Sequence, residues 1–544
     1  MDKTEAVQVE IASQSDVVKG ARQKQVVGNL KLLDGGQTIL VPTPSPDPKD
    51  PLNLPPWRKW AVLILVSAYG CTAVVLASGL GPIFSIVSAS YPGQTARAND
   101  LLTYPALFMG IGNLIAMPLA LSIGRRPVFL ASILLLVAGG IWCACSKSLG
   151  SHIAGRDIMS LAAGQSEALA PMIVQEIFFL HERGRKLAWF IFIECVAQGI
   201  FFVVSTYMTS AWGWRWWYGF FTIFNAIILA LSLVFVTETL FDRPEDASTG
   251  AVELEFNEKG DLETGGEIHK IVRVTTAHGV VLEPERFGPR TWRHDLRIFS
   301  AKPRWVEFLE CYKHIGQGFC VPSMFWLLLM NGSFLGLYIF EASTFAGVLL
   351  SPPYSFSFNS LGYVQAGQVL SCLIFLPVLG YGSDWVVRVM SRRNGGNFKP
   401  EYRLLPLWIP AVVCVVCAII YGQSAAHPKE WHWSAPVVAY NASFFAFLGA
   451  NVVGITYAVE SFPLRAAPLL VILCAGRGFI SFGLAYATLP SIQAIGYDGA
   501  TLVEGIIAGV LALMTVPVYL LGPRIRAFGQ KRFAMGSSKE AEEQ

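Results

Sequence analysis

Charged residues are scarce in this sequence. Only 15% of its 544 residues are Asp, Glu, Lys or Arg, whereas 53% are hydrophobic, a balance that few water-soluble domains show. The formal net charge is +3, and the basic residues are scattered between apolar runs, so they form no continuous basic face of the kind that binds nucleic acid. We therefore expect no nucleic-acid partner, and apolar side chains that face lipid.

Several chemical motifs are also missing. The ten cysteines lie mostly inside apolar stretches without paired metal-ligand spacing, so we expect no metal site and no cofactor. Gly110-Ile111-Gly112 is not a dinucleotide loop, because Ile115 occupies the third glycine position, and no Gly-rich phosphate loop is present. No loop groups His, Asp and Ser or Cys at catalytic spacing. The sequence thus argues against an enzyme and against an ATP-driven pump.

Long apolar runs recur along the chain. A helix needs about 20 apolar residues to cross a bilayer core of roughly 30 Å. Runs of this size lie at 60–81, 101–123, 128–146, 156–180, 187–208 and 216–237, and again at 321–345, 361–386, 404–421, 434–459, 468–489 and 502–521. The sequence therefore predicts an all-α membrane protein with twelve transmembrane helices in two six-helix bundles.

Polar segments divide the chain into five parts. Residues 1–56 are polar and lack an apolar core before a small-residue cleavage site, so we expect a flexible cytosolic tail rather than a secretory signal. The bundles are expected at 57–239 and 319–523, with a cytosolic tail at 524–544. The segment 240–318 carries acidic residues followed by a run of arginines, and we expect it to be a soluble, cytosolic central linker.

Lys and Arg residues in the short loops determine the predicted orientation, because cytoplasmic loops carry the excess of them. One side of the predicted membrane collects nearly all of these residues. They are Arg58, Lys59, Arg125, Arg126, Arg183, Arg185, Lys186, Arg388, Arg392, Arg393, Arg465, Arg524 and Arg526. We therefore expect both termini in the cytosol and a multi-pass protein of the cell membrane, with the vacuolar membrane as the alternative.

Two six-helix halves joined by a cytosolic linker are typical of transporters that bind substrate between repeated halves near the bilayer midplane. Short motifs occur from Pro51 to Asn394. They are Pro51-Leu52-Asn53, Trp57-Arg58-Lys59-Trp60, Gly124-Arg125-Arg126-Pro127, Glu167-Ala168-Leu169 with Pro171, Phe178 to Gly184, Gly213-Trp214-Arg215-Trp216, Glu238-Thr239, Pro352-Pro353-Tyr354, Gly380 with Asp384, and Arg392-Arg393-Asn394.

With these motifs the chain resembles the major facilitator superfamily, and within it the fungal drug:proton antiporter branch that includes polyamine-type transporters. The resemblance implies a monomeric secondary transporter in the lipid bilayer, with a small-molecule substrate and protons as its partners. Because the sequence has no Gly-rich phosphate loop, we expect an ion or substrate gradient to supply the energy.

The loop after the second predicted helix resembles the gating motif of this family. Arg125 and Arg126, which follow Gly124, are expected to face anionic lipid and to bond carbonyls at neighbouring helix ends, which would lock the halves in one state. The motif usually has an acidic residue and a first glycine where this chain has Leu121 and Met117. The amino-terminal gate is therefore degenerate.

The second half keeps more of the motif, as Gly380 and Asp384 are both present. We expect Asp384 to pair with Arg388 or with the Arg392-Arg393 cluster. For all of these loop charges the alternative role is to set the membrane topology, and the two roles can coexist.

Ionisable residues inside the membrane are the strongest functional candidates, because each costs about 2.5–3.5 kcal/mol at a helix centre. Glu167 and Glu194 lie about twelve and eight residues into helices four and five, which places both near mid-depth. A desolvated carboxylate there can take a proton from one side and release it to the other as the halves rock. The alternative for Glu167 is a hydrogen bond within helix packing near Pro171.

Arg156 resembles the arginine of the helix-four motif that the family associates with proton coupling. The usual Gln-Gly of that motif is Met159-Ser160 here. The alternative is that Arg156 snorkels to the outer interface or pairs with Asp157.

Two more charged residues lie in the second half. Arg477, near the middle of helix eleven, is flanked by Gly476 and Gly478, which allow close helix approach. It could bind an anionic substrate or neutralise a glutamate. Glu341, near the outer end of helix seven, could contact the substrate or lie at the interfacial surface.

Helix five departs from the antiporter motif of the family, because Gly199-Ile200 stands where Gly-Pro is usual. Without the proline the helix lacks its expected bend, and Gln198, one turn from Glu194, is a candidate for a different pocket chemistry. The direction of transport is consequently open.

Three classes of function fit these residues. The leading one is proton-coupled efflux of a drug, toxin or secondary metabolite. The second is proton-coupled uptake of a nutrient or polyamine. The third is a membrane receptor that senses a substrate without transporting it, or an integral membrane enzyme.

Overall fold

The computed structural model describes residues 33–34, 37–38, 44–241, 251–253, 271–273, 284–299, 303–394, 399–462 and 465–533. Within them, strands are confined to two small antiparallel sheets. Strand β1 (Leu33–Asp34) pairs with β2 (Gln37–Thr38), and β3 (Ala251–Glu253) pairs with β4 (Ile271–Arg273). All other regular structure is helical.

The amino-terminal half is built from long apolar helices. They are α2 (Pro56–Ser78), α5 (Asp100–Ile123), α6 (Arg125–Cys145), α7 (Leu149–Ala163) followed by η3 (Gly164–Ser166) and α8 (Leu169–Ile177), α9 (Leu180–Trp212) and α10 (Trp214–Phe235). The short helices are η1 (Pro51–Asn53), η2 (Gly81–Ile83), α3 (Phe84–Ala89) and α4 (Thr95–Ala98). A glycine at 213 with φ of 84° makes the tight turn between α9 and α10.

The carboxy-terminal half repeats this pattern. Its helices are α14 (Pro322–Leu350), α15 (Ser360–Ala366) followed by α16 (Gln368–Phe375), the π-helical η5 (Leu376–Tyr381) and α17 (Gly382–Arg393), η6 (Pro400–Leu407) followed by α18 (Trp408–Ala426), α19 (Ser434–Ser461), α20 (Ala466–Leu513) and α21 (Thr515–Phe533). Helix α20 is two helices joined at Gly496, where φ is 74°. The glycine reverses the chain with almost no loop, because it adopts this φ without strain.

Helical segments lie in all twelve ranges that the apolar runs predict. Ten helices of the described residues are long and apolar enough to cross a membrane. One of these ten, α20, contains the predicted range 468–489 and the first part of 502–521, which ends in α21, and the fourth predicted range is interrupted between α7 and α8. The prediction of an all-α membrane protein with two helical bundles is confirmed.

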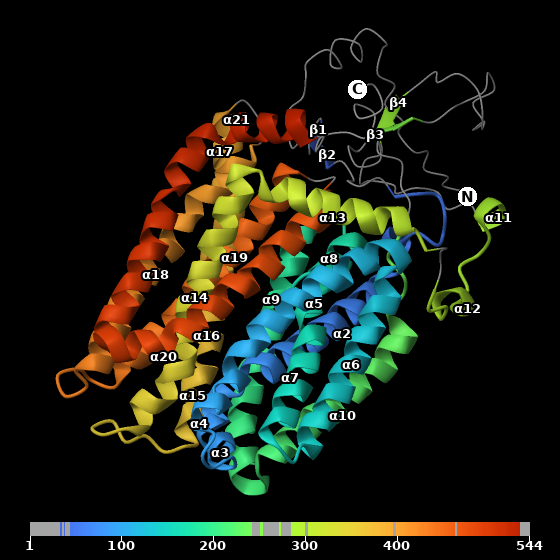
Figure 1. Cartoon of the computed structure of the whole chain (residues 1–544). Helices are drawn as coiled ribbons and strands as arrows, with labels where there is room; N and C mark the ends of the chain where they lie inside the picture. Colours follow the sequence, from blue (N-terminus) through green and yellow to red (C-terminus); the bar gives the residue numbers. More distant parts are fainter. Residues whose placement is uncertain are drawn as a thin grey trace, which may run out of the picture.

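The two halves stand side by side, and short helices mark the two ends of the bundle (Figure 1). Helices α3 and α4 lie at one end, whereas α11 (Pro284–Phe287), α12 (Trp292–Asp295) and α13 (Trp305–Phe319) lie at the other. Helix α13 bridges the halves. Its Tyr312 hydroxyl donates to the carbonyl of Leu114 on α5 at 3.0 Å, and Gly318 packs against Leu469 and Ile472 on α20.

Small residues bring the two halves into close contact. Gly110 on α5 faces the carbonyl of Ala475 on α20, and Gly478 on α20 faces the carbonyl of Ala106 on α5, with no room at either glycine for a side chain. Such reciprocal glycines let two helix backbones approach inside a membrane. The predicted close approach around Arg477 is therefore present.

Cysteines contribute packing rather than cross-links. All ten are free, and eight of them are buried or partly shielded inside the helical core. The two exposed thiols are Cys145, at the end of α6, and Cys320, which follows α13.

Candidate transport site

A proline places Glu167 at a break in the fourth apolar segment. Pro171 has no N–H to donate to the carbonyl of Glu167, and its ring clashes with that carbonyl in a regular helix. The helix accordingly stops after η3 and restarts at Leu169. The freed carbonyl of Glu167 accepts a hydrogen bond from the thiol of Cys474 on α20, at 3.5 Å. The break therefore turns Glu167 toward the other half of the protein.

Arg477 neutralises Glu167 across the two halves. Its guanidinium lies 2.6 Å from the Glu167 carboxylate, with side-chain exposures of 3% and 23%. The same guanidinium donates to Oδ1 of Asn451 on α19 and stands over the ring of Phe447 at 5.4 Å. Of the two roles predicted for Arg477, the structure shows the pairing with a glutamate. The Glu167 carboxylate contacts Arg477 in the other half rather than a group near Pro171, and its role in proton coupling stays a prediction.

Glu194 has no such partner. It projects from α9 toward Gly70 on α2, where an added Cβ would lie 3.2 Å from the carboxylate oxygen Oε1. Among the described residues, no Lys, Arg or His side chain forms an ion pair with it, and Glu167 is the neighbouring carboxylate within electrostatic range. Gln198, one turn further along α9, is buried at 6% exposure. The site thus combines one neutralised and one uncompensated carboxylate.

Aromatic rings of the other half lie next to these charges. Tyr338 on α14 stacks on Phe447 with ring centroids 6.0 Å apart and on Tyr440 at 5.6 Å. The side-chain amide of Gln368 on α16 donates to the hydroxyls of Tyr338 and Tyr440 at 2.7 and 3.0 Å. The guanidinium of Arg477 also lies over the ring of Phe447. The aromatic stack therefore adjoins the ion pair of Arg477 with Glu167.

Arg156 is buried inside the amino-terminal half and links its helices by hydrogen bonds. It is 1% exposed, and its guanidinium donates to the carbonyls of Leu101, Leu76 and Ala77 and to the hydroxyl of Tyr218. These partners belong to α5, α2 and α10, so one side chain ties four helices together. The expectations that Arg156 snorkels to the interface or pairs with Asp157 are wrong, because its donors are used inside the bundle.

Both gating arginines are buried. Glu238 accepts the backbone N–H groups of Arg125 and Arg126 at 2.9 and 3.2 Å, which satisfies the first donors of α6. Gly124, with φ of 111°, leaves room for that carboxylate. The side chain of Arg125 pairs with Glu176 at 2.8 Å. The expectation that the two arginines face lipid is therefore wrong, and Glu176 supplies the acidic partner that the degenerate motif lacks at Leu121.

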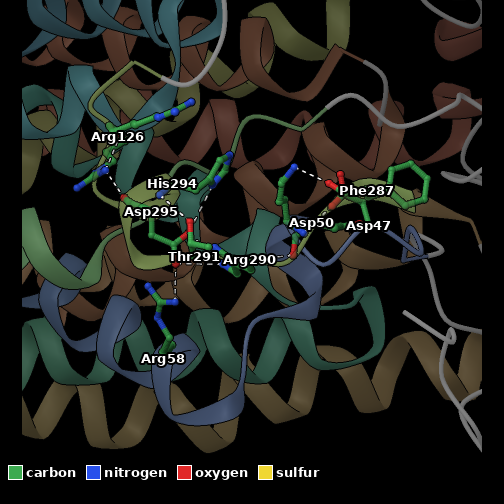
Figure 2. Close-up of polar contacts among 11 residues, drawn as sticks. Asp47, Asp50, Arg58, Arg126, Phe287, Arg290, Thr291, His294 and Asp295 are labelled. Carbon is green, nitrogen blue, oxygen red and sulfur yellow. Dashed lines mark hydrogen bonds and ion pairs between the residues drawn. The ribbon is translucent and has the colours of Figure 1, made fainter. Parts of the chain in front are cut away.

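Arg126 instead anchors the central linker. Its guanidinium donates to the carbonyls of Asp295 and Arg297 in the linker and to that of Leu233 in α10. The Asp295 carboxylate lies between Arg58 at 2.7 Å and Arg290 at 3.0 Å (Figure 2). We call residues 284–299, with these contacts, the linker clasp. The clasp is packed on the end of the amino-terminal half, so this part of the predicted linker is structured.

The gate of the second half uses a different arginine from those expected. Arg403, in the middle of η6, binds Asp384 and, at 2.9 Å, Glu460 at the end of α19. The expected pairing of Asp384 with Arg388 or with Arg392 and Arg393 is wrong. Arg388 donates to the backbone carbonyl of Asp384, and both residues of the Arg392-Arg393 cluster are exposed. Gly380 lies in the π-helical turn just before Asp384.

Glu341 is fully buried, at 0% exposure, so the expectation of an interfacial surface position is wrong. One carboxylate oxygen accepts from the hydroxyl of Ser443 on α19 at 3.0 Å. The other oxygen has no hydrogen-bond partner in the described part of the chain. Glu341 points into the interior of the carboxy-terminal half and not toward Glu167.

Sequence reasoning missed several charged residues and did not predict a partner for Arg526. Glu401 and Arg526 form an ion pair at 2.9 Å with exposures of 3% and 2%, and Arg403 with Glu460 closes the neighbouring helix ends. Glu504, inside the last apolar run, was also missed, although an acidic residue among apolar neighbours is itself a signal.

Comparisons with known proteins agree with this architecture. The family model described as Major Facilitator Superfamily matches residues 60–469. An uncharacterized MFS-type transporter of Schizosaccharomyces pombe is 23% identical over 92% of this chain and 90% of its own length. The efflux pump radE of Floropilus chiversii is 22% identical over 89% of this chain and 83% of its own length.

The fold is also found among solved structures. The partially occluded, inward open xylose transporter XylE from E. coli superimposes with a TM-score of 0.55 at 14% identity, covering 85% of this chain and 98% of XylE. Because the family model spans well over half of the sequence and the helices have the expected arrangement, the chain belongs to the Major Facilitator Superfamily of membrane transporters.

Proposed function

We propose that this transporter couples the export of a small molecule to proton uptake, with Glu194 as the proton-binding carboxylate. The observation that carries the proposal is the contrast between two nearby glutamates. Glu167 is neutralised by Arg477 at 2.6 Å, whereas Glu194 has no cationic partner among the described residues. A carboxylate that is shielded from water and lacks a counter-ion binds a proton readily.

The two glutamates also offer a way to couple the proton to movement. Charged Glu194 repels Glu167 and drives its carboxylate toward Arg477, which strengthens the link between the halves. Protonated Glu194 removes this repulsion. The proton on Glu194 therefore weakens the ion pair between Glu167 and Arg477. This pair must rearrange when the two halves rock around the central site.

The relatives support export as the direction, since one of them is named an efflux pump. Proton-coupled uptake of a nutrient or polyamine uses the same carboxylates and remains the alternative direction, and a non-transporting receptor is the third reading. We propose bundles at 57–239 and 319–523 in a monomer of the cell membrane or the vacuolar membrane. We also propose that both termini lie in the cytosol, because the loops rich in Lys and Arg fall on one side of the membrane.

Accumulation in cells tests the direction. Cells that express or lack the chain are loaded with labelled organic cations, toxins and polyamines, with and without a proton uncoupler. Export predicts lower accumulation in expressing cells, and the uncoupler abolishes the difference. Higher accumulation would establish uptake instead, and binding without any flux would establish the receptor reading.

Substitution of the glutamate tests the mechanism. In proteoliposomes loaded with a compound identified by that screen, Glu194→Gln is expected to remove the dependence of flux on the pH gradient. Glu430→Gln, which changes an exposed glutamate in a loop, is the matched control and should leave flux unchanged. If both Glu194→Gln and Glu167→Gln retained pH-dependent flux, the assignment of coupling to these residues would be wrong.

A further inference from the structure

The linker clasp carries apolar side chains on its outer face. Those that are exposed by about half or more are Trp292 (50%), Leu296 (48%), Ile298 (46%) and Phe299 (63%). None of them belongs to a buried apolar cluster of the described residues. The backbone that carries them is nevertheless held in place, because Arg126 bonds the carbonyls of Asp295 and Arg297. Exposed apolar side chains gathered on one fixed segment indicate an interaction surface.

The clasp is bonded to the carboxyl end of α10. The guanidinium of Arg126 donates to the carbonyl of Arg297 in the clasp and to that of Leu233 in α10, both at 2.7 Å. Leu233 lies in the last turn of α10, which is long and apolar enough to cross a membrane. Leu231 and Val234 are 42% and 41% exposed, so α10 keeps an apolar outer surface up to its end. The clasp therefore lies where α10 leaves the bilayer, and Figure 1 shows α12 at the flank of the amino-terminal half.

Two tryptophans connect the clasp with the apolar surface of α10. The guanidinium of Arg58 lies 4.6 Å from the ring centre of Trp292 and 6.0 Å from that of Trp57. Trp57, which is 56% exposed, packs edge-on against Phe235, the last residue of α10, with ring centroids 6.4 Å apart. Tryptophan is enriched where the hydrocarbon core meets the headgroups of a membrane. The apolar face of the clasp thus continues a surface that faces lipid.

The charges that the clasp turns outward are positive. Arg293 and Arg297 are exposed, and neither side chain forms an ion pair within the described part of the chain. The acidic residue between them, Asp295, faces inward and is neutralised by Arg58 and Arg290. Long arginine side chains can keep their apolar stems along an apolar surface while their guanidinium groups reach polar headgroups. This combination of apolar and basic side chains complements a membrane surface that contains anionic lipid.

We propose that residues 292–299 dock on the membrane surface and select anionic lipid. Their apolar side chains enter the boundary between headgroups and acyl chains, and Arg293 and Arg297 bind lipid phosphate groups. The inference uses the cytosolic position proposed above for the linker, but it requires neither proton coupling nor a particular substrate. Because the same segment bonds Arg126, the docked clasp connects the gating loop with the lipid headgroups.

Fluorescence quenching on the full chain in lipid nanodiscs tests the docking. After Cys145→Ser and Cys320→Ser remove the exposed native thiols, a fluorophore is attached at Leu296→Cys. Nitroxide-labelled lipids are expected to quench this fluorophore, and aqueous iodide is expected to quench it several-fold less. Glu285→Cys, an exposed position on α11 of the same clasp, is the matched control and should be quenched by iodide.

Two results at position 296 would overturn the docking. A fluorophore quenched by iodide as strongly as at position 285 would place the segment in water. A fluorophore shielded from both iodide and lipid would show that another part of the chain covers the clasp. Symmetric nanodiscs present the same lipid on both faces, so neither result depends on the orientation proposed for the protein.

The charge of the lipid is tested with the same fluorophore. Nitroxide-labelled phosphatidylserine is expected to quench it several-fold more than nitroxide-labelled phosphatidylcholine at an equal mole fraction. Arg293→Gln with Arg297→Gln should abolish this preference and keep the clasp in place, because Arg126 bonds backbone carbonyls there. Arg392→Gln with Arg393→Gln, an exposed basic pair at the end of α17, is the control and should leave the preference unchanged. Equal quenching by the two lipids in the wild type, or a preference that survives without Arg293 and Arg297, would overturn the selection of anionic lipid.

Discussion

The guanidinium of Arg477 lies 2.6 Å from the carboxylate of Glu167, and this ion pair joins the two halves of the transporter near the middle of the bundle. Glu167 belongs to the break between η3 and α8, and Arg477 to α20. Arg477 is buried and Glu167 is half-buried, so each one stabilises the charge of the other at a point that must rearrange during transport.

Removal of one partner from this ion pair is expected to be costly. Glu167→Gln leaves the buried guanidinium of Arg477 without a counter-charge, which destabilises the fold by about 3 kcal/mol. The double variant Glu167→Gln with Arg477→Gln should be less destabilised than the sum of the two single variants. Unfolding of the purified protein in detergent measures this difference, and strictly additive effects would contradict a direct interaction.

The break that presents Glu167 is expected to depend on Pro171. Pro171→Ala supplies an N–H for the carbonyl of Glu167, so the helix can continue and the contact with Cys474 is lost. We predict a several-fold fall in flux with the protein still folded. Pro322→Ala is the control, because that proline is at the first position of α14, where no helical hydrogen bond is missing. Equal effects of the two substitutions would argue against a special role for the break.

Arg156 is expected to stabilise the fold rather than to carry protons. Arg156→Lys removes the planar fork, so several of the four acceptors now bonded to Arg156 lose their donor, which costs about 1–3 kcal/mol for each buried group left unpaired. Thermal unfolding should therefore begin at a lower temperature. The pH profile of flux by the surviving protein should keep its shape, and a shifted profile would instead assign Arg156 to proton coupling.

The linker clasp is expected to open in acid. Burial alone would raise the pKa of Asp295, but hydrogen bonds from Arg290 and Arg58 outweigh burial and hold its pKa below the usual value. The carboxylate therefore stabilises the docked state above the pKa of an unfolded Asp, about 3.9, and this contribution is lost as the pH falls through the lower pKa of the folded state.

The same clasp can be opened at neutral pH by substitution. Asp295→Asn removes the charge between Arg58 and Arg290, so trypsin should cut after Arg290 and Arg293 several-fold faster than in the wild type. Glu285→Gln changes an exposed carboxylate of the same segment and serves as the control. Identical rates of cleavage for both variants would show that Asp295 does not hold the segment in place.

Apolar runs alone predicted the helices well, because a helix satisfies its backbone hydrogen bonds inside lipid within a single segment. The break in the fourth helix was harder to predict from the sequence. Its cause is the single proline Pro171, inside a predicted range, 156–180, that is otherwise continuous. The turn at Gly496 was predicted as a gap between two runs, although the structure makes it with one residue.

Charged partners were harder to predict than charged residues. Glu167, Glu194 and Arg477 stood out because charge is rare inside apolar runs, but the pairing of Glu167 with Arg477 joins positions 310 residues apart and has no local pattern. The sequence separation of Asp384 from Arg388 suggested a helical pair, yet tertiary contacts favoured Arg403. Arg126 was unpredictable for the same reason, since its acceptors are carbonyls of the linker.

The two exposed thiols, Cys145 and Cys320, lie at the ends of α6 and α13. If the proposed orientation holds, Cys145 faces the medium and Cys320 the cytosol, and no engineered cysteine is needed to read the orientation of the protein in intact cells. A membrane-impermeant maleimide added outside should modify Cys145 alone, and Cys320 should react only after the cells are opened. Labels on Cys145 and Cys320 would then report the distance between the two faces of the transporter.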